Sequence, residues 1–270
     1  MRFTGALRSE FTKLLTTRMW WVLALILVVY VAFTAAALGA TFGGILPGGD
    51  EAGLVGDGAP ALVYSVAVTV GYVFPVILGT LSITGEVRHQ TLTPTFLTTP
   101  RRGIVLAAKL VVLFVFGVFY GVVALATSVA VGAGLFTLGE VSTGLDDGEI
   151  WLMFARAVLA MGIWAVIGVG LGTLIPNQIA AIVVLLAFTQ FVEPILRTAG
   201  MFVEGLSEVA KFLPGAAGDA LVGASVFAAM SGPDASGALL EWWQGGLVLL
   251  GIAVVVALIG SLTTWRKDVT

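Results

Sequence analysis

Basic and acidic segments alternate along this sequence, and long apolar runs separate them. Ten of the thirteen Lys and Arg residues lie in three segments, which are residues 1–18, residues 86–109 and the C-terminal stretch with Arg266 and Lys267. Most Asp and Glu residues lie in the segments between them. Lys and Arg are retained on the cytoplasmic side of an inserted membrane protein. The alternation therefore predicts that both termini are cytoplasmic and that the number of spans is even.

The composition also indicates a membrane environment. Hydrophobic residues make up 59% of the 270 residues, charged residues make up 11%, and the mean hydropathy is +1.06. A typical soluble domain carries about 25% charged residues. The sequence contains no cysteine, which excludes disulfides and cysteine-ligated metals.

Six segments are apolar over the roughly 20 residues that a helix needs to cross a bilayer. They are residues 19–40, 62–84, 108–136, 152–174, 178–197 and 245–264. We predict an all-α polytopic membrane protein with six transmembrane helices. Its organisation is an N-terminal cytoplasmic interfacial helix within residues 1–18, followed by one six-span domain over residues 19–270.

The long segment before the last predicted span, residues 198–243, is expected to be external. Within it, the stretch from Ala216 to Met230 is apolar but too short to cross the bilayer. Pro and Gly residues interrupt the segment and favour turns. We therefore expect short helices that lie on the outer leaflet or dip into it.

The predicted spans offer no catalytic or metal-binding arrangement. The single histidine, His89, cannot form a two-histidine zinc motif, and no nucleophile with its base occurs inside a span. Lys109, Arg156 and Glu193 lie near span ends and are expected to reach toward water or a vestibule. Ion-coupled transporters carry ionisable residues within their spans, so this class is disfavoured. We predict no catalytic residue, no metal site and no enzymatic activity of this chain by itself.

Apolar residues recur at helical spacing before the first span. They are Phe3, Leu7, Phe11, Leu14 and Leu15. On a helical wheel they fall on one side, whereas Ser9, Lys13 and Thr16 fall on the other. This pattern predicts a cationic amphipathic helix in the inner membrane interface. The alternative is an extended basic tail that only sets the topology, although such a tail needs no apolar stripe.

The cytoplasmic loop of residues 85–103, between the second and third spans, has the character of a docking surface. Its stretch from Thr91 to Leu97 is expected to form one or two exposed turns that carry Leu92, Phe96 and Leu97. The charged residues that flank this stretch are Glu86, Arg88, Arg101 and Arg102. Exposed apolar side chains within a charged rim are typical of a protein interaction site.

Four residues within the spans are candidates for lining a substrate path. They are Tyr72, Phe74, Phe188 and Gln190. Ordinary packing in the core remains an equally good interpretation of each.

Small residues and one proline predict how the spans pack and bend. Gly117 with Gly121, and Gly168 with Gly172, have the four-residue spacing that lets two helix backbones approach closely. Pro75 lacks a backbone N–H, so we expect it to kink the second span.

The chain resembles the permease subunits of ABC-2 type ABC transporters, particularly short bacterial ones. The residues that carry the resemblance are SEFTKL at 9–14, TR-x-WW at 17–21, TGEVRHQT at 84–91, PRR at 100–102 and AK at 108–109. The six-span layout extends it over the whole chain. One departure is that His89 and Gln90 precede Thr91, where the family often has a glycine before the threonine.

The resemblance implies a function and partners. It implies a membrane-spanning permease of an ATP-driven transporter in the bacterial inner membrane, with a lean toward export. It also implies that a second permease chain, the same or related, pairs with this one, and that ATPase subunits bind below. Residues 3–16 would be the interfacial helix, residues 86–99 the coupling helix with Thr91 among its contact residues, and residues 198–243 the external re-entrant helices.

ATP and Mg are expected in the partner ATPase, because this sequence has no Gly-Lys dipeptide and hence no Walker A phosphate loop. No cofactor is expected in this chain, and nothing in the sequence suggests nucleic-acid binding. The alternative function is a non-transporting membrane scaffold or sensor that assembles partner proteins. Copurification with or without an ATPase distinguishes the two.

Overall fold

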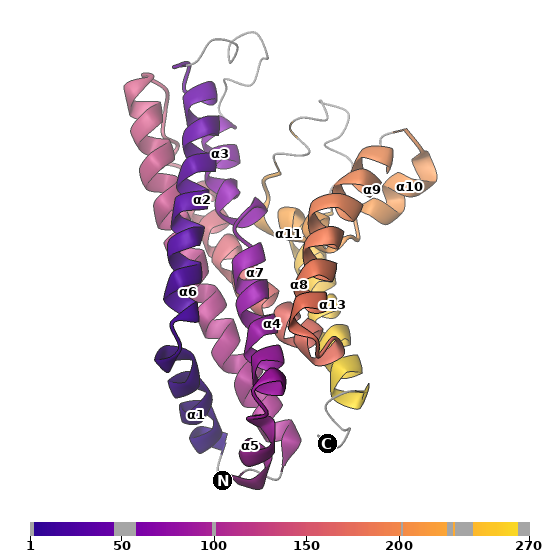
Figure 1. Cartoon of the computed structure of the whole chain (residues 1–270). Helices are drawn as coiled ribbons and strands as arrows, with labels where there is room; N and C mark the ends of the chain where they lie inside the picture. The colour runs from indigo at the N-terminus through magenta and orange to yellow at the C-terminus, as the bar shows by residue number, and fades with distance from the viewer. Residues whose placement is uncertain are drawn as a thin grey trace.

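The computed structural model describes residues 3–45, 58–98, 101–200, 202–225, 229 and 240–263. Within these ranges the chain is helical and contains no strand. The six long apolar segments are α2 (Met19–Phe42), α3 (Ala59–Thr69) with α4 (Val73–Arg88), α6 (Arg102–Leu138), α7 (Gly148–Leu174), α8 (Gln178–Ala187) with η1 (Phe188–Val192) and α9 (Glu193–Gly200), and α13 (Trp242–Thr263). The prediction of an all-α protein with six spans is confirmed in the described part of the chain (Figure 1).

Shorter helices lie toward the two ends of the bundle. The helices α1 (Phe3–Thr16) and α5 (Leu92–Thr98) lie at one end, which we call the α5 end (Figure 1). The helices α10 (Glu204–Ala210) and α11 (Pro214–Val222) lie in the opposite half. Short helices were expected before the last span, and α10 and α11 are such helices. Within the apolar stretch from Ala216 to Met230, α11 ends at Val222, where Gly223 adopts a left-handed φ of 87°; Met230 lies outside the described residues.

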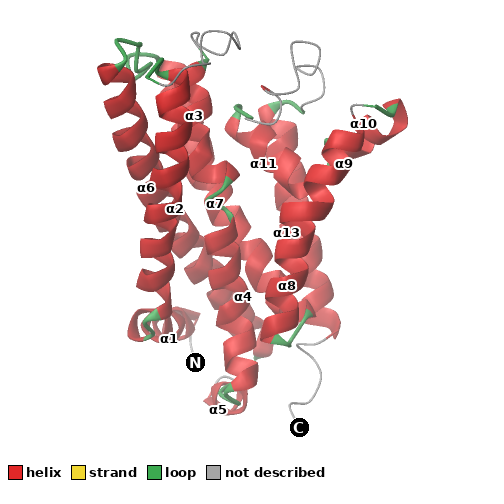
Figure 2. Cartoon of the chain, turned by 45° about the horizontal axis from the view of Figure 1, so that its top comes forward, coloured by secondary structure: helices red, strands yellow, loops and turns green. Residues whose placement is uncertain are grey.

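Helix α4 of the second span and helix α7, the fourth span, form the centre of the bundle. Figure 2 shows α4 and α7 between α2, α3 and α6 on one side and α8, α9, α11 and α13 on the other. The most apolar window of the second and of the fourth span is 72% buried, against 22% for the fifth span. The fifth span thus exposes most of its apolar surface, and such a helix is stable only where lipid or another apolar partner covers it.

Glycines bring the central helices into backbone contact. A Cβ at Gly117 of α6 would lie 2.5 Å from the Met161 carbonyl oxygen, and one at Gly168 of α7 would lie 2.8 Å from Val76 Cα. Neither site can hold a larger residue unless the helices separate. Both glycine pairs that the sequence singled out therefore lie in helix contacts, since Gly121 and Gly172 also face backbone atoms of α7 and α4 at 3.0 and 2.7 Å, respectively.

The second span is broken between α3 and α4. Residues 70–72 form the break, and Pro75 lies in the first turn of α4. Proline cannot donate to the carbonyl four residues earlier, and the amide of Phe74 donates to Gly71 O instead, at 3.1 Å. The bend expected at Pro75 is thus present just upstream of it. It brings the ring of Tyr72 to 4.4 Å from that of Trp164, centroid to centroid, in a stacked geometry.

Candidate functional site

The helix α1 packs onto α6 through a face that includes a carboxylate. Its buried residues are Ala6, Glu10 and Leu14. Of the predicted apolar stripe, Leu14 lies in the core and Leu7 packs partly against it, whereas Phe3, Phe11 and Leu15 are exposed. The helix over residues 3–16 was predicted correctly. The apolar stripe therefore faces the bundle only in part. Glu10, a charged residue, is buried on the same face of α1 as Leu14.

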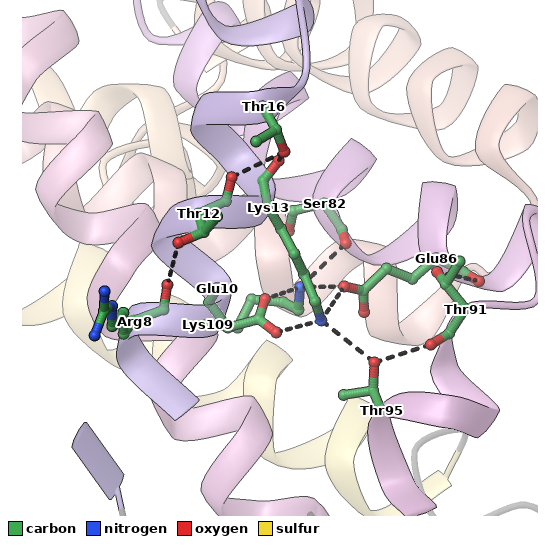
Figure 3. Close-up of polar contacts among 10 residues, drawn as sticks. All are labelled: Arg8, Glu10, Thr12, Lys13, Thr16, Ser82, Glu86, Thr91, Thr95 and Lys109. Atoms are coloured by element: carbon green, nitrogen blue, oxygen red, sulfur yellow. Dashed lines mark hydrogen bonds and ion pairs between the residues drawn. The ribbon is translucent and has the colours of Figure 1, made fainter. Parts of the chain in front are cut away.

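Four charged side chains meet where α1 contacts α4 and α6 (Figure 3). Lys13 Nζ donates to Glu10 Oε1 at 2.6 Å and to Glu86 Oε1 at 2.9 Å. Lys109 Nζ donates to Glu10 Oε2, and to Glu86 Oε1 at 3.2 Å. We call Glu10, Lys13, Glu86 and Lys109 the inner charge cluster. It contains two acids and two bases, so their charges balance.

The inner charge cluster connects four helices. Glu10 and Lys13 belong to α1, Glu86 to the last turn of α4, and Lys109 to the start of α6. Lys13 Nζ also donates to Thr95 Oγ1 of α5 at 3.3 Å, and Lys109 Nζ donates to the carbonyl oxygen of Ser82 in α4 at 3.3 Å (Figure 3). The cluster therefore ties α5 to the helices that precede and follow it, and ties all of them to α1.

Burial makes this cluster energetically important. The Lys109 side chain is 2% exposed and that of Glu10 is 4% exposed. A buried charge without a partner costs several kcal/mol, whereas a paired and hydrogen-bonded charge is tolerated. The expectation that Lys109 reaches toward water was wrong, because its ammonium group is taken up by Glu10 and Glu86. One atom, Glu86 Oε2, is buried without a hydrogen-bond partner among the described residues.

The neighbouring charges and hydrogen bonds keep Glu10 and Lys13 of α1 in their charged forms. Burial alone would raise the pKa of Glu10, but the Lys109 ammonium and the hydrogen bonds from Lys109 and Lys13 outweigh it, so the pKa lies below its ordinary value. Burial alone would lower the pKa of Lys13, but the charge of Glu86 and the bonds to Glu10 outweigh it, so the pKa lies above its ordinary value. Both shifts favour the charged forms, and the ion pairs persist at neutral pH.

The apolar residues of the predicted docking loop do not share one surface. Leu92 is 3% exposed and belongs to the core, so the expectation that it is accessible was wrong. Phe96 is half-buried, and the Arg102 guanidinium lies over its ring at 4.9 Å from the centroid. Leu97 is 78% exposed. Helix α5 therefore uses Leu92 and Phe96 to attach itself to the bundle and presents Leu97 outward.

The polar residues of the loop have several different positions. Arg88 Nη1 donates to Gln178 Oε1 at the start of α8, at 3.4 Å. Thr91 Oγ1 donates to the backbone oxygen of Glu86, at 3.4 Å. Arg101 is exposed at the N-terminus of α6. Only Glu86 among the predicted loop residues enters the inner charge cluster.

The four candidates for a substrate path separate into two groups. Tyr72 and Gln190 line one cavity, together with residues of α7 and α11. Phe74 instead packs against Tyr30, with ring centroids 6.2 Å apart, and Phe188 is half-buried in η1. Neither Phe74 nor Phe188 lines that cavity.

The inner charge cluster and the burial of Glu193 and Asp219 were not predicted from the sequence. The available signal was the position of these charges. Glu10 lies among the residues of an amphipathic helix, and Lys109 lies within an apolar run. A charge in such a place requires a partner. Glu10 and Lys109 are partners about a hundred residues apart in sequence, so helical periodicity could not pair them.

A family model described as ABC-2 family transporter protein matches residues 6–193. The chain belongs to this family. The match runs from the first turn of α1 to the end of η1 and includes every residue of the inner charge cluster. No curated protein sequence matches the chain. As an ABC-2 family transporter protein, the chain is a multi-pass membrane component of the kind that works with ABC ATPase partners.

Proposed function

We propose that this ABC-2 family protein is the permease subunit of an ATP-driven exporter, and that a separate ATPase binds it at the α5 end. The observation that supports the proposal best is the attachment of α5. The inner charge cluster and the buried Leu92 join α5 to α1, α4 and α6, while Leu97 remains exposed. Export is the direction that the family resemblance implies.

The attachment explains how force could pass from an ATPase to the spans. Helix α5 directly links α4 to α6 along the chain, and Lys13 links it to α1. A close-packed and ion-paired unit moves as a body rather than deforming locally. A displacement of α5 by the ATPase would therefore shift both spans and α1 together.

The partner ATPase would supply the nucleotide chemistry. ATP and Mg would bind there, through a Walker A loop that this sequence lacks. Leu97 and Arg101 would contact the ATPase, because both are exposed at the α5 end. Glu86, Thr91, Leu92, Phe96 and Arg102 would hold α5 in place, and Arg88 would connect the loop to α8.

A second permease chain, the same or related, would complete the transporter. Helices α2, α8 and α13 bury little of their apolar surface within this chain. Such surface must face lipid or another membrane helix, and these three helices expose enough of it to contact both.

The α5 end is proposed to face the cytoplasm of a bacterial inner membrane, as its basic residues favour. The cysteine-free sequence makes this easy to test with single introduced cysteines. Cysteines that replace Arg8, Gly103 and Lys267 should react with an impermeant thiol reagent only in inside-out vesicles. Those that replace Asp50, Asp146 and Gly205 should react from outside. Labelling of position 103 from outside would reverse the proposed orientation.

Replacing Leu97 tests the docking site. Leu97→Ala should weaken binding of the ATPase about thirtyfold, because loss of an interface hot spot costs at least about 2 kcal/mol. Affinity is measured between the purified chain and its ATPase. Leu138→Ala is the matched control, since Leu138 is 76% exposed at the other end of α6.

Phe96→Ala adds a second readout. Phe96 packs beneath Arg102, so its loss should loosen α5 and uncouple ATP hydrolysis from transport. If both the Leu97 and the Phe96 variants bind the ATPase and couple hydrolysis as the unchanged chain does, the docking assignment is wrong. A stable complex that contains no ATPase would favour the scaffold function instead.

A further inference from the structure

A cavity with three charged side chains in its lining lies next to α11. Its volume is about 170 Å³, whereas a single water needs only about 10–15 Å³ of comparable volume. It lies among the break between α3 and α4, α7, the fifth span and α11. The side chains that matter for its chemistry are Tyr72, Trp164, Glu193, Arg197 and Asp219.

Glu193 is held at the N-terminus of α11. Its Oε1 accepts a hydrogen bond from the Ala216 amide at 2.9 Å. A carboxylate is stabilised at this position because the first amides of a helix are unpaired and the helix dipole is positive there. The fit is close, since a Cβ at Gly215 would lie 2.8 Å from Glu193 Cδ. The Glu193 residue is 3% exposed, so this anchoring holds its carboxyl group inside the protein.

The second carboxylate of the cavity, Asp219, forms an ion pair. Arg197 Nη2 forms an ion pair with Asp219 Oδ2 at 2.8 Å, and Ser225 Oγ donates to the same oxygen at 2.7 Å. The cavity side chains thus carry two acids and one base. These residues therefore include one more acid than base.

Two buried polar atoms of the cavity residues lack hydrogen bonds. Glu193 Oε2, an acceptor, and Trp164 Nε1, a donor, are both buried without a partner among the described residues. The Trp164 residue is 1% exposed and its indole stacks on Tyr72. Leaving such groups unpaired in an apolar interior is unfavourable, and buried polar atoms are normally paired. A ligand that satisfies both atoms must offer a donor and an acceptor.

We propose that this cavity binds a primary ammonium group whose carbon chain carries an oxygen acceptor, as in an amino alcohol. The ammonium group donates to Glu193 Oε2 and supplies a second positive charge beside the two acids. The ligand oxygen accepts from Trp164 Nε1, and the carbons pack against Tyr72. The same chemistry occurs in free ethanolamine and in the headgroup of phosphatidylethanolamine. The site concerns ligand binding by this chain alone and does not depend on the proposed coupling to an ATPase.

The test uses the full chain in nanodiscs of phosphatidylglycerol and titration calorimetry. Ethanolamine is expected to bind at least tenfold more tightly than choline, which lacks N–H donors, and than ethylene glycol, which lacks the charge. Equal binding of ethanolamine and ethylene glycol, or no binding of ethanolamine, would overturn the proposal. These comparisons need no substitution and so do not depend on the folding of a variant.

Substitutions then locate the site. Glu193→Gln should weaken ethanolamine binding at least tenfold, and Trp164→Phe, which keeps a ring against Tyr72, should weaken it about fivefold, as expected for one hydrogen bond. Glu208→Gln is the matched control, because this carboxylate lies in α10 and is 73% exposed. Unchanged binding by a folded Glu193→Gln variant would refute the assignment.

A change of lipid distinguishes the two sources of the ligand. If the lipid headgroup occupies the cavity, ethanolamine binding should disappear in nanodiscs that contain phosphatidylethanolamine. If a free amine is the ligand, binding should persist there. Either result supports an ammonium site and identifies its source.

Discussion

Lys109→Met should release α1 from the bundle. The substitution leaves two acids and one base in the inner charge cluster, because Glu10 and Glu86 lose a shared partner. Removing one member of a buried ion pair typically costs about 3–5 kcal/mol. Methionine fills nearly the same space as the lysine stem, so the loss reflects charge rather than packing. We therefore expect weaker attachment of both α1 and α5.

Cross-linking measures this release directly. The rings of Phe11 in α1 and Phe116 in α6 lie 5.7 Å apart, so cysteines at these two positions should be joined by a short thiol cross-linker. Lys109→Met should reduce the yield severalfold and lower the thermal stability. Lys211→Met is the matched control, because its partner Glu208 is largely exposed and such pairs contribute at most about 1 kcal/mol.

A double substitution separates charge imbalance from loss of lysine. Glu10→Leu combined with Lys109→Met leaves Lys13 and Glu86 as a balanced pair. Replacing both members of a buried ion pair by apolar residues is often neutral. Cross-linking should therefore recover in the double variant. If Lys109→Met alone keeps full cross-linking and stability, the inner charge cluster does not hold α1.

Gly168→Val should disrupt the centre of the bundle. A Cβ at this position would lie 2.8 Å from Val76 Cα, where the obstacle is the backbone of α4 rather than a flexible side chain. The helices α4 and α7 must then separate, and the contacts along both are lost. Overpacking in a core typically costs about 1–3 kcal/mol, and a backbone clash falls at or above the upper end. We expect a large fall in the thermal unfolding temperature and in the amount of folded protein in membranes.

Gly251→Val provides the control for this substitution. Gly251 lies in α13, and nothing lies within 4 Å of a Cβ placed there. The same change of residue should therefore leave stability nearly unchanged. Equal unfolding temperatures for the two variants would show that the contact between α4 and α7 is not as close as the geometry requires.

The spans were predictable from the sequence because burial in lipid depends on local composition. A helix in a bilayer satisfies its own backbone hydrogen bonds, so about 20 apolar residues are sufficient to indicate one. The same reasoning identified the α1 helix from the spacing of Phe3, Leu7 and Leu14, and the bend near Pro75 from its missing N–H. The short helices before the last span followed from apolar stretches that are too short to cross.

The charge pairs and the cavity depended on which helix faces which. Periodicity indicates that Glu10 lies beside apolar residues of α1, but only the packing of α1 on α6 brings it to Lys109. The same packing turns Leu92 inward and leaves Leu97 exposed, although both are leucines in one short helix. Glu193 and Trp164 meet one cavity because the break at Tyr72 and the position of α11 place them there. These contacts join residues far apart in sequence. No local pattern predicts them, because a buried charge needs a partner that only the packing of one helix on another supplies.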